Sequence, residues 1–247
     1  MRGLLKLTWL EIRIFVREPL GFVAAVGIPL AMFLLLGRSL SPDTSQSATR
    51  TQFLAQDLPL FVSIFISINA ALSLIAVISI YREGGILKRL RATPLRPATI
   101  LGAHVLVKLF FTGLSLLLVV LAGRRYYPVP LHPHVAGFGF AVALTTVTIL
   151  CMGFIIASMV ATARFAQLIG SAIFYPMLAL SGMFVPLSSM PHPWALLGSV
   201  LPMSHAVALL RGAWVGVGWL VLMPHLVALT LTIAVCLGLT TRVFRWE

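Results

Sequence analysis

Long apolar runs separated by short polar segments make up most of the chain. Six such runs lie at roughly residues 20–37, 58–80, 99–122, 135–160, 166–186 and 217–240. Crossing a hydrocarbon core of about 30 Å takes roughly 20 apolar residues in a helix, and a helix satisfies its own backbone hydrogen bonds in lipid. No run shows the alternation of apolar and polar residues that is typical of outer-membrane strands. The pattern predicts six transmembrane helices.

The composition fits a protein that resides in lipid. Hydrophobic residues make up 60% of the 247 residues and charged residues 10%, whereas a soluble domain is about 45–50% apolar and about 25% charged. Six spans joined by short loops leave no room for a separate soluble domain. We therefore expect an all-α integral membrane fold in which residues 1–247 form a single transmembrane domain.

The N-terminal residues 1–18 show a helical pattern of charge. At 100° per residue the basic residues share one stripe: Arg2, Lys6, Arg13 and Arg17. The neighbouring face is apolar: Leu5, Trp9, Ile12 and Val16. This pattern is typical of a helix that lies in the membrane interface with its basic side toward the headgroups. The alternative is a simple charged lead-in to the first span.

The formal net charge is +12, but the lysines and arginines are scattered between the apolar runs. This scatter indicates contacts with anionic lipid headgroups rather than with nucleic acid. If the N-terminus lies inside, most of the 18 basic residues fall in inside segments. Only five arginines fall outside: Arg38, Arg50, Arg124, Arg125 and Arg211. The positive-inside rule then places both termini in the cytoplasm.

The fifth run and the stretch after it are rich in proline. Prolines stand at positions 176, 186, 191 and 193, and a second short apolar piece at 195–214 contains Pro202. Two short helices broken at a proline are not long enough to cross a bilayer. They can dip into its outer half and return if they are buried against protein. Residues 187–215 are therefore predicted to form an outer re-entrant helix pair.

A charged segment, YREGGILKRLRATPLRP, lies between the second and third spans at residues 81–97. Glu83 and the pair Gly84–Gly85 mark the end of the second span, and Pro94 ends a short amphipathic helix. A short helix held between two rigid spans is a site where a cytoplasmic protein can bind and thereby move the membrane helices. The alternative is a positively charged loop that only sets the topology.

Two stretches resemble the signature of ABC-2 type transporter permeases, the membrane subunits of a class of ATP-binding-cassette exporters. In the first stretch the matching residues are Arg82, Glu83, Gly85, Leu87, Arg89, Leu90, Thr93, Pro94 and Leu95, while Ile86 replaces the usual threonine. In the second stretch they are Ser181, Gly182, Pro186, Leu187, Pro191, Leu201, Pro202, Arg211 and Gly212. Together with the six-span layout, the resemblance covers most of the chain.

The resemblance implies a type V exporter-like fold in the inner membrane of a bacterial cell. Such a fold has an interfacial elbow helix, six transmembrane helices, a cytoplasmic coupling helix and an outer re-entrant helix pair. It also implies that two permeases, identical or homologous, pair with two cytoplasmic ATPase subunits. The residues expected to contact the ATPase are Glu83, Gly85, Ile86, Leu87, Lys88, Leu90, Arg91, Thr93 and Pro94.

The chain has no G-x-x-x-x-G-K-[ST] loop to bind nucleotide phosphates. We therefore expect a permease that is not itself an enzyme and carries no cofactor or metal, with ATP and Mg²⁺ bound by the partner ATPase. The histidines near the outer half are interpreted as interfacial side chains rather than metal ligands: His132, His134, His192, His205 and His225.

The resemblance further implies that spans two and five line the substrate path between two permeases. The polar candidates in these spans are Ser63, Ser67, Asn69, Ser73, Gln167, Ser171 and Tyr175. Polar groups in lipid are costly, so they should face protein or a cavity; helix–helix packing through small residues is the alternative. A neutral, mostly apolar lining suits hydrophobic or amphipathic compounds, as in multidrug efflux. An ABC-2 permease for polysaccharide or glycolipid is a second possibility.

Two other classes of function stay open. A proton-coupled transporter usually carries ionisable residues at membrane depth, but no carboxylate occurs between Gly84 and Trp246. His104 and Lys108 are one turn apart in the third span, and we interpret Lys108 as a residue that snorkels to the inner interface. An intramembrane enzyme needs a Ser–His or metal-ligand constellation, and no credible spacing occurs.

Overall fold

The computed structural model describes residues 2–39, 58–85, 97–126, 135–160 and 162–243. All regular elements in these ranges are helices, which confirms the predicted all-α class. They are α1 (Arg2–Arg17), α2 (Pro19–Phe22), the π-helical turn η1 (Val23–Gly27), α3 (Ile28–Ser39), α5 (Leu58–Glu83), α7 (Pro97–Tyr126), α8 (Val135–Met159), α9 (Ala163–Ala179), the 3-10 turn η3 (Leu187–Ser189), α10 (His192–Val200), α11 (Pro202–Val215) and α12 (Trp219–Val243).

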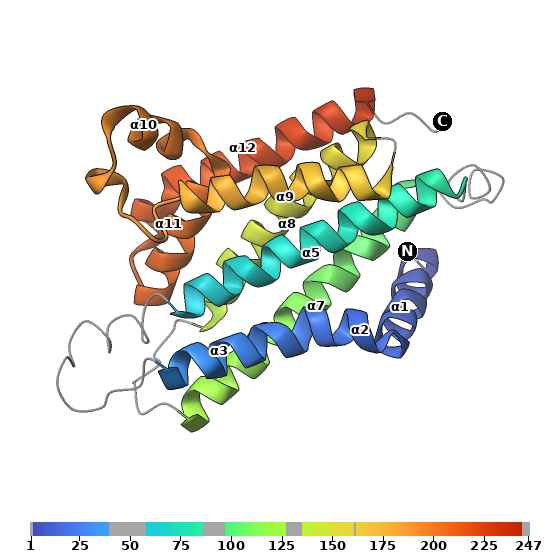
Figure 1. Ribbon diagram of the computed structural model, residues 1–247, viewed down its shortest axis with the longest axis horizontal. Helices are drawn as coiled ribbons and strands as arrows, with labels where there is room; N and C mark the ends of the chain where they lie inside the picture. Colours follow the sequence, from blue (N-terminus) through green and yellow to red (C-terminus); the bar gives the residue numbers. More distant parts are fainter. Residues whose placement is uncertain (1, 40–57, 86–96, 127–134, 161, 244–247) are drawn as a thin grey trace.

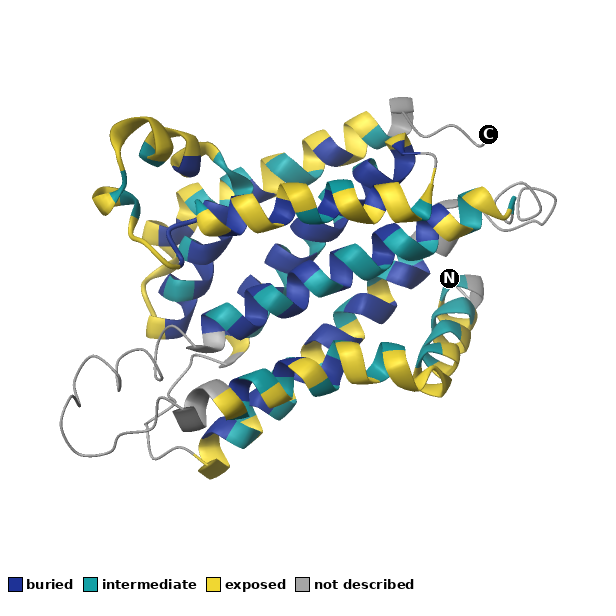
Figure 2. Cartoon of the chain, in the orientation of Figure 1, coloured by how far each residue is buried: buried dark blue, intermediate teal, exposed yellow. Residues whose placement is uncertain are grey.

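Helix α5 lies at the centre of the molecule. Its most extensive contact is with α8, and α9 and α11 also pack on it, while α12 covers α8 (Figure 1). On the other side of α5, α3 and α7 form a second group, and α1 packs on α7. Buried residues follow α5, α8 and α11, whereas α1, α10 and α12 expose much of their length (Figure 2). The apolar core is therefore built around α5 and α8.

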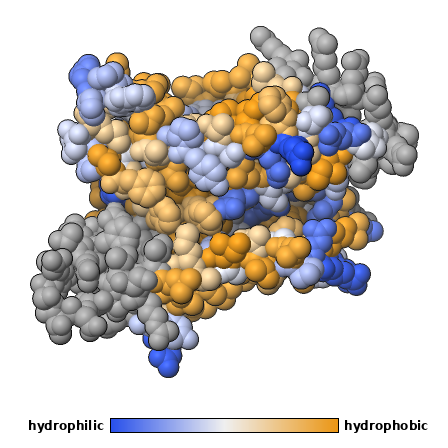
Figure 3. Space-filling view, viewed as in Figure 1, coloured by the Kyte–Doolittle hydropathy of each residue, from blue (hydrophilic) through white to orange (hydrophobic). Residues whose placement is uncertain are grey.

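Different helices and helix ends lie at the two ends of the bundle. Helix α1 and the last turns of α5 and α12 lie at one end, and α10 and the last turn of α3 lie at the other (Figure 1). Hydrophobic side chains cover much of the surface between these ends (Figure 3). On α12, for example, Leu220 is 87% exposed. Such an apolar outer surface is expected of a protein that faces lipid.

Within the described residues, four helices are long and apolar enough to cross a membrane: 60–83, 102–126, 136–159 and 219–240. The number rises to as many as six if each of two bent helix pairs counts as one span. In the first pair, α1 meets the helix that begins at Pro19 at an angle of 95°. A bend of this size separates α1 from the following helix, so α2, η1 and α3 together correspond to the predicted span 20–37.

The predicted fifth span, 166–186, has the wrong boundaries. Helix α9 begins at Ala163, because the Thr162 Oγ1 accepts a hydrogen bond from the Phe165 backbone N–H and caps the helix. It ends at Ala179, after which Gly182 takes a left-handed backbone conformation with φ of +79°. Its 17 residues measure about 25 Å, so α9 is shorter than predicted.

Helices α10 and α11 form the second bent pair, with an angle of 77° between them. The break falls at Leu201, directly before Pro202, as the sequence pattern indicates. Ser204 fixes the bend, because its Oγ donates a 2.5 Å hydrogen bond to the Gly198 carbonyl oxygen. The two helices are too short to cross a bilayer separately, and a re-entrant position in the outer half stays a prediction.

Candidate functional site

A cavity of about 320 Å³ lies where the two groups of helices meet. Residues from α1, α2, η1, α5, α7 and α9 line it. Hydrophilic residues appear in the hollow between the two groups in an otherwise hydrophobic face (Figure 3). The wall includes Ala25 from the π-helical turn η1, and π-helical turns within α-helices are frequent at functional sites. This cavity is the candidate substrate site.

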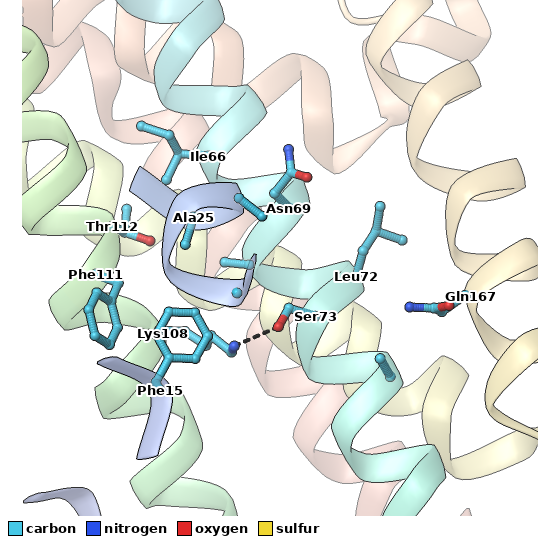
Figure 4. Close-up of a pocket in the computed structure, with 14 residues that line it drawn as sticks. Phe15, Ala25, Ile66, Asn69, Leu72, Ser73, Lys108, Phe111, Thr112 and Gln167 are labelled. Carbon is cyan, nitrogen blue, oxygen red and sulfur yellow. Dashed lines mark hydrogen bonds between the residues drawn. The ribbon is translucent and has the colours of Figure 1, made fainter. Parts of the chain in front are cut away.

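Three of the seven predicted path residues line this cavity: Asn69 and Ser73 from α5 and Gln167 from α9. Asn69 Nδ2 donates a hydrogen bond to the Phe65 carbonyl oxygen at 2.8 Å, which fixes its amide on the cavity side of α5. Gln167 approaches from the opposite wall (Figure 4). The structure therefore brings polar groups of spans two and five to one cavity.

Two other predicted path residues lie elsewhere. Ser63 and Ser67 are completely buried, with exposed fractions of 0% and 1%. The hydroxyls of Ser67 and Thr146 on α8 share a hydrogen bond at 3.0 Å, and Ser67 Oγ also donates to the Ser63 carbonyl oxygen. Neither serine lines the cavity. Their position is the one expected of helix–helix packing between α5 and α8.

The remaining two path residues, Ser171 and Tyr175, belong to α9 but do not line the cavity. Ser171 and Gln167 line a shallower pocket of about 270 Å³ beside the cavity, together with Arg164. Ser171 Oγ donates a hydrogen bond to the Leu168 carbonyl oxygen. Tyr175 is 47% exposed. Gln167 and Ser171 therefore place polar groups of α9 beside the cavity, whereas Tyr175 lines neither pocket.

Lys108 is a lining residue that the sequence analysis assigned to another role. Its Nζ belongs to an almost completely buried side chain, which disagrees with the snorkelling interpretation. Instead it donates a 2.7 Å hydrogen bond to Ser73 Oγ and lies 4.7 Å from the centre of the Phe15 ring (Figure 4). Only 6% of the residue is exposed. The lining of the cavity is therefore not neutral.

Glu11 and His104 lie on the α1–α7 side of Lys108. The Glu11 Oε2 is 3.9 Å from His104 Nδ1, and the rings of His104 and Tyr81 are 5.6 Å apart. Burial raises the pKa of the Glu11 carboxyl above its ordinary value, the positive charge of Lys108 lowers it, and the charge of Glu18 raises it further. These side chains hold α1 against the start of α7 near the cavity.

The predicted ATPase contact begins where α5 ends. Glu83 is the last residue of α5 and is exposed, and Gly85 adopts a left-handed conformation with φ of +63°. Two backbone hydrogen bonds close the helix, from the Gly84 N–H to the Ile80 oxygen and from the Gly85 N–H to the Arg82 oxygen. The other predicted contact residues lie outside the described residues: Ile86, Leu87, Lys88, Leu90, Arg91, Thr93 and Pro94.

Arg82, directly before Glu83, joins the end of α5 to the end of α8. Its Nη1 donates to the carbonyl oxygens of Ala157, Ser158 and Val160, at 3.2, 2.6 and 3.2 Å. The last carbonyls of a helix have no partner within the helix, and a cation there also interacts favourably with the helix dipole. From the sequence, Arg82 is a signature residue and an inside basic residue, and neither feature indicates this contact.

The described part of the chain contains no group of three or more metal-ligating residues. His205 on α11 and His225 on α12 form a pair, with their Nδ1 atoms 3.0 Å apart. His132 and His134 lie outside the described residues. The His205–His225 contact joins α11 to α12.

A comparison with protein-family models matches residues 2–215 of the chain to the ABC-2 type transporter model. No curated protein matches the chain. The match includes both signature stretches and all cavity-lining elements, and it confirms the resemblance on which the site residues were chosen. The chain therefore belongs to the ABC-2 type transporter family, as a membrane permease with several helices suited to crossing a bilayer.

Proposed function

We propose that the chain is the permease subunit of an ATP-driven exporter that moves hydrophobic or amphipathic compounds out of a bacterial cell. The observation that carries the proposal is the cavity between α5, α7 and α9, which places polar groups of α5 and α9 in a mostly apolar wall. Its volume of about 320 Å³ lies at the small end of the range for ligand pockets, about 300–1,000 Å³.

Energy for export comes from a separate ATPase in this proposal. The sequence has no phosphate-binding loop, and ABC-2 permeases associate with ATP-binding-cassette subunits. Two permeases, identical or homologous, enclose the path, and both termini and the loop after α5 face the cytoplasm. In support of this arrangement, α1 and the ends of α5 and α12 lie at the same end of the bundle (Figure 1).

Glu83 is the described residue best placed to contact the ATPase, because it is exposed at the point where α5 ends. We expect Glu83→Ala to reduce export to nearly the level seen without ATP, while the protein stays in the membrane. ATP hydrolysis should continue, because the mutation affects the contact that transmits movement from the ATPase to the permease and leaves the ATPase site unchanged. Leu90→Asp in the predicted coupling helix should have the same effect.

This prediction is tested in inverted membrane vesicles by ATP-dependent uptake of a hydrophobic fluorescent drug. Arg124→Ala is a suitable control, because Arg124 is exposed near the end of α7, far from Glu83. Wild-type uptake by both Glu83→Ala and Leu90→Asp would contradict the coupling role. Uptake that requires a proton gradient and ignores ATP would favour the proton-coupled alternative.

A further inference from the structure

We propose that the cavity around Lys108 binds amphiphiles with an anionic headgroup, such as a carboxylate or phosphate on a hydrocarbon chain. The proposal rests on the proposed export function and specifies the substrate class of the same cavity. It requires a positive group that is short of partners, an apolar wall beside it, and space for a ligand. The cavity has all three.

The first requirement is met by the Lys108 ammonium. An ammonium has three N–H donors and no acceptor, yet with the described residues Lys108 makes one hydrogen bond, to Ser73 Oγ, and one ring contact, with Phe15. Within the described residues no carboxylate forms an ion pair with it, although Glu11 and Glu18 act on it electrostatically from farther away. A charge at membrane depth normally has a close partner. A ligand anion would supply that partner.

The second requirement is an apolar wall. Ile66, Ala25 and Phe111 surround the space next to the ammonium (Figure 4). The amides of Asn69 and Gln167 also border the cavity and can donate hydrogen bonds to headgroup oxygens. A charged group beside an apolar surface is complementary to a molecule that has a charged headgroup and an apolar chain. The volume of about 320 Å³ accommodates a headgroup and the first part of its chain.

The sign of the charge selects among amphiphiles. An ammonium only donates hydrogen bonds, so a carboxylate or phosphate accepts from it and compensates its charge. An amphiphile with an ammonium headgroup would be repelled. A hydrogen bond to a charged group contributes about 1.5–3 kcal/mol, which corresponds to a preference of about tenfold or more.

The test uses calorimetry to measure the equilibrium binding of dodecanoate and of dodecylammonium to the purified full-length chain in neutral-detergent micelles. We expect the wild type to bind dodecanoate about tenfold or more tightly than dodecylammonium. Lys108→Met should remove this preference, because methionine is unbranched and of similar size but carries no charge. Lys6→Met, at an exposed position of α1, should leave the preference unchanged.

Two further variants separate ligand binding from a structural role. Ser73→Ala removes the described hydrogen-bond acceptor of Lys108 but keeps the charge, so dodecanoate binding should stay or strengthen. Ala25→Leu fills the cavity from η1 without changing Lys108, so dodecanoate binding should weaken. These two results are informative even if Lys108→Met does not fold.

Equal binding of the two probes by the wild type would overturn the proposal, and so would an unchanged preference in folded Lys108→Met. ATP-dependent uptake of a neutral drug in inverted vesicles is measured in parallel. If the preference for dodecanoate is absent but this uptake is still observed, only the proposed charge selectivity is wrong and the export function stands. If ATP-dependent uptake is absent in the wild type, the export function itself is wrong.

Discussion

Arg82→Met should lower the free energy of unfolding by about 2–3 kcal/mol. Arg82 donates to three carbonyl oxygens at the end of α8, and the bond to Ser158 is short, at 2.6 Å. Methionine fills similar space but donates nothing, so these carbonyls lose a charged donor and the helix end loses a favourable cation. Hydrogen bonds to charged groups and helix-end charges of this kind together account for about 2–3 kcal/mol.

Unfolding of the purified chain in mixed micelles with increasing sodium dodecyl sulfate measures this effect. Arg164→Met is the matched control, because Arg164 is exposed at the start of α9 and makes no hydrogen bond within the described residues. Arg82→Lys should lie between the wild type and Arg82→Met, since lysine keeps the charge but lacks the planar fork. Equal losses in Arg82→Met and Arg164→Met would contradict the capping role.

Gly198→Ala is expected to be the most damaging small substitution around α10 and α11. A Cβ at this position of α10 would lie 2.6 Å from the Leu180 carbonyl oxygen and 2.7 Å from Leu187 Cδ2. The carbonyl belongs to the backbone at the end of α9 and cannot rotate away. The two segments must separate, and overpacking of this kind costs about 1–3 kcal/mol. The separation would also disturb the hydrogen bond from Ser204 to the Gly198 carbonyl.

Two other glycines serve as graded controls for the same unfolding measurement. At Gly212 on α11 an added Cβ meets the end of the flexible Leu222 side chain, so Gly212→Ala should cost less than Gly198→Ala. At Gly113 on α7 a Cβ meets nothing within 4 Å. Gly113→Ala should therefore be neutral or stabilising by up to about 1 kcal/mol. A reversed order of the three variants would show that α10 does not pack on the end of α9 as described.

Local signals in the sequence predicted the fold class and several helix ends. Apolar runs of about 20 residues mark membrane helices because lipid requires them. The end of α5 at Glu83 follows from the two glycines after it, and the break before α11 follows from Pro202. Each of these features depends on neighbouring residues alone, so it can be predicted from the local sequence.

Features that depend on the packing of distant helices were missed. Hydrophobicity does not distinguish the lipid-facing side of a span from the side that faces protein, so Ser67 and Asn69 looked alike although they face different helices. The same ambiguity hid the inward direction of Lys108. Arg82 donates to carbonyl oxygens more than 70 residues away along the chain, and no local sequence pattern predicts such a contact.

We propose that this permease works with a separate ATPase. This claim is tested most directly by purifying the tagged chain in mild detergent from cells that express the predicted partner, and by assaying ATP hydrolysis of the eluate with and without hydrophobic drugs. We predict a co-purifying ATPase subunit whose turnover rises with the drug. A chain that elutes without an ATPase, from cells that contain one, would contradict the account.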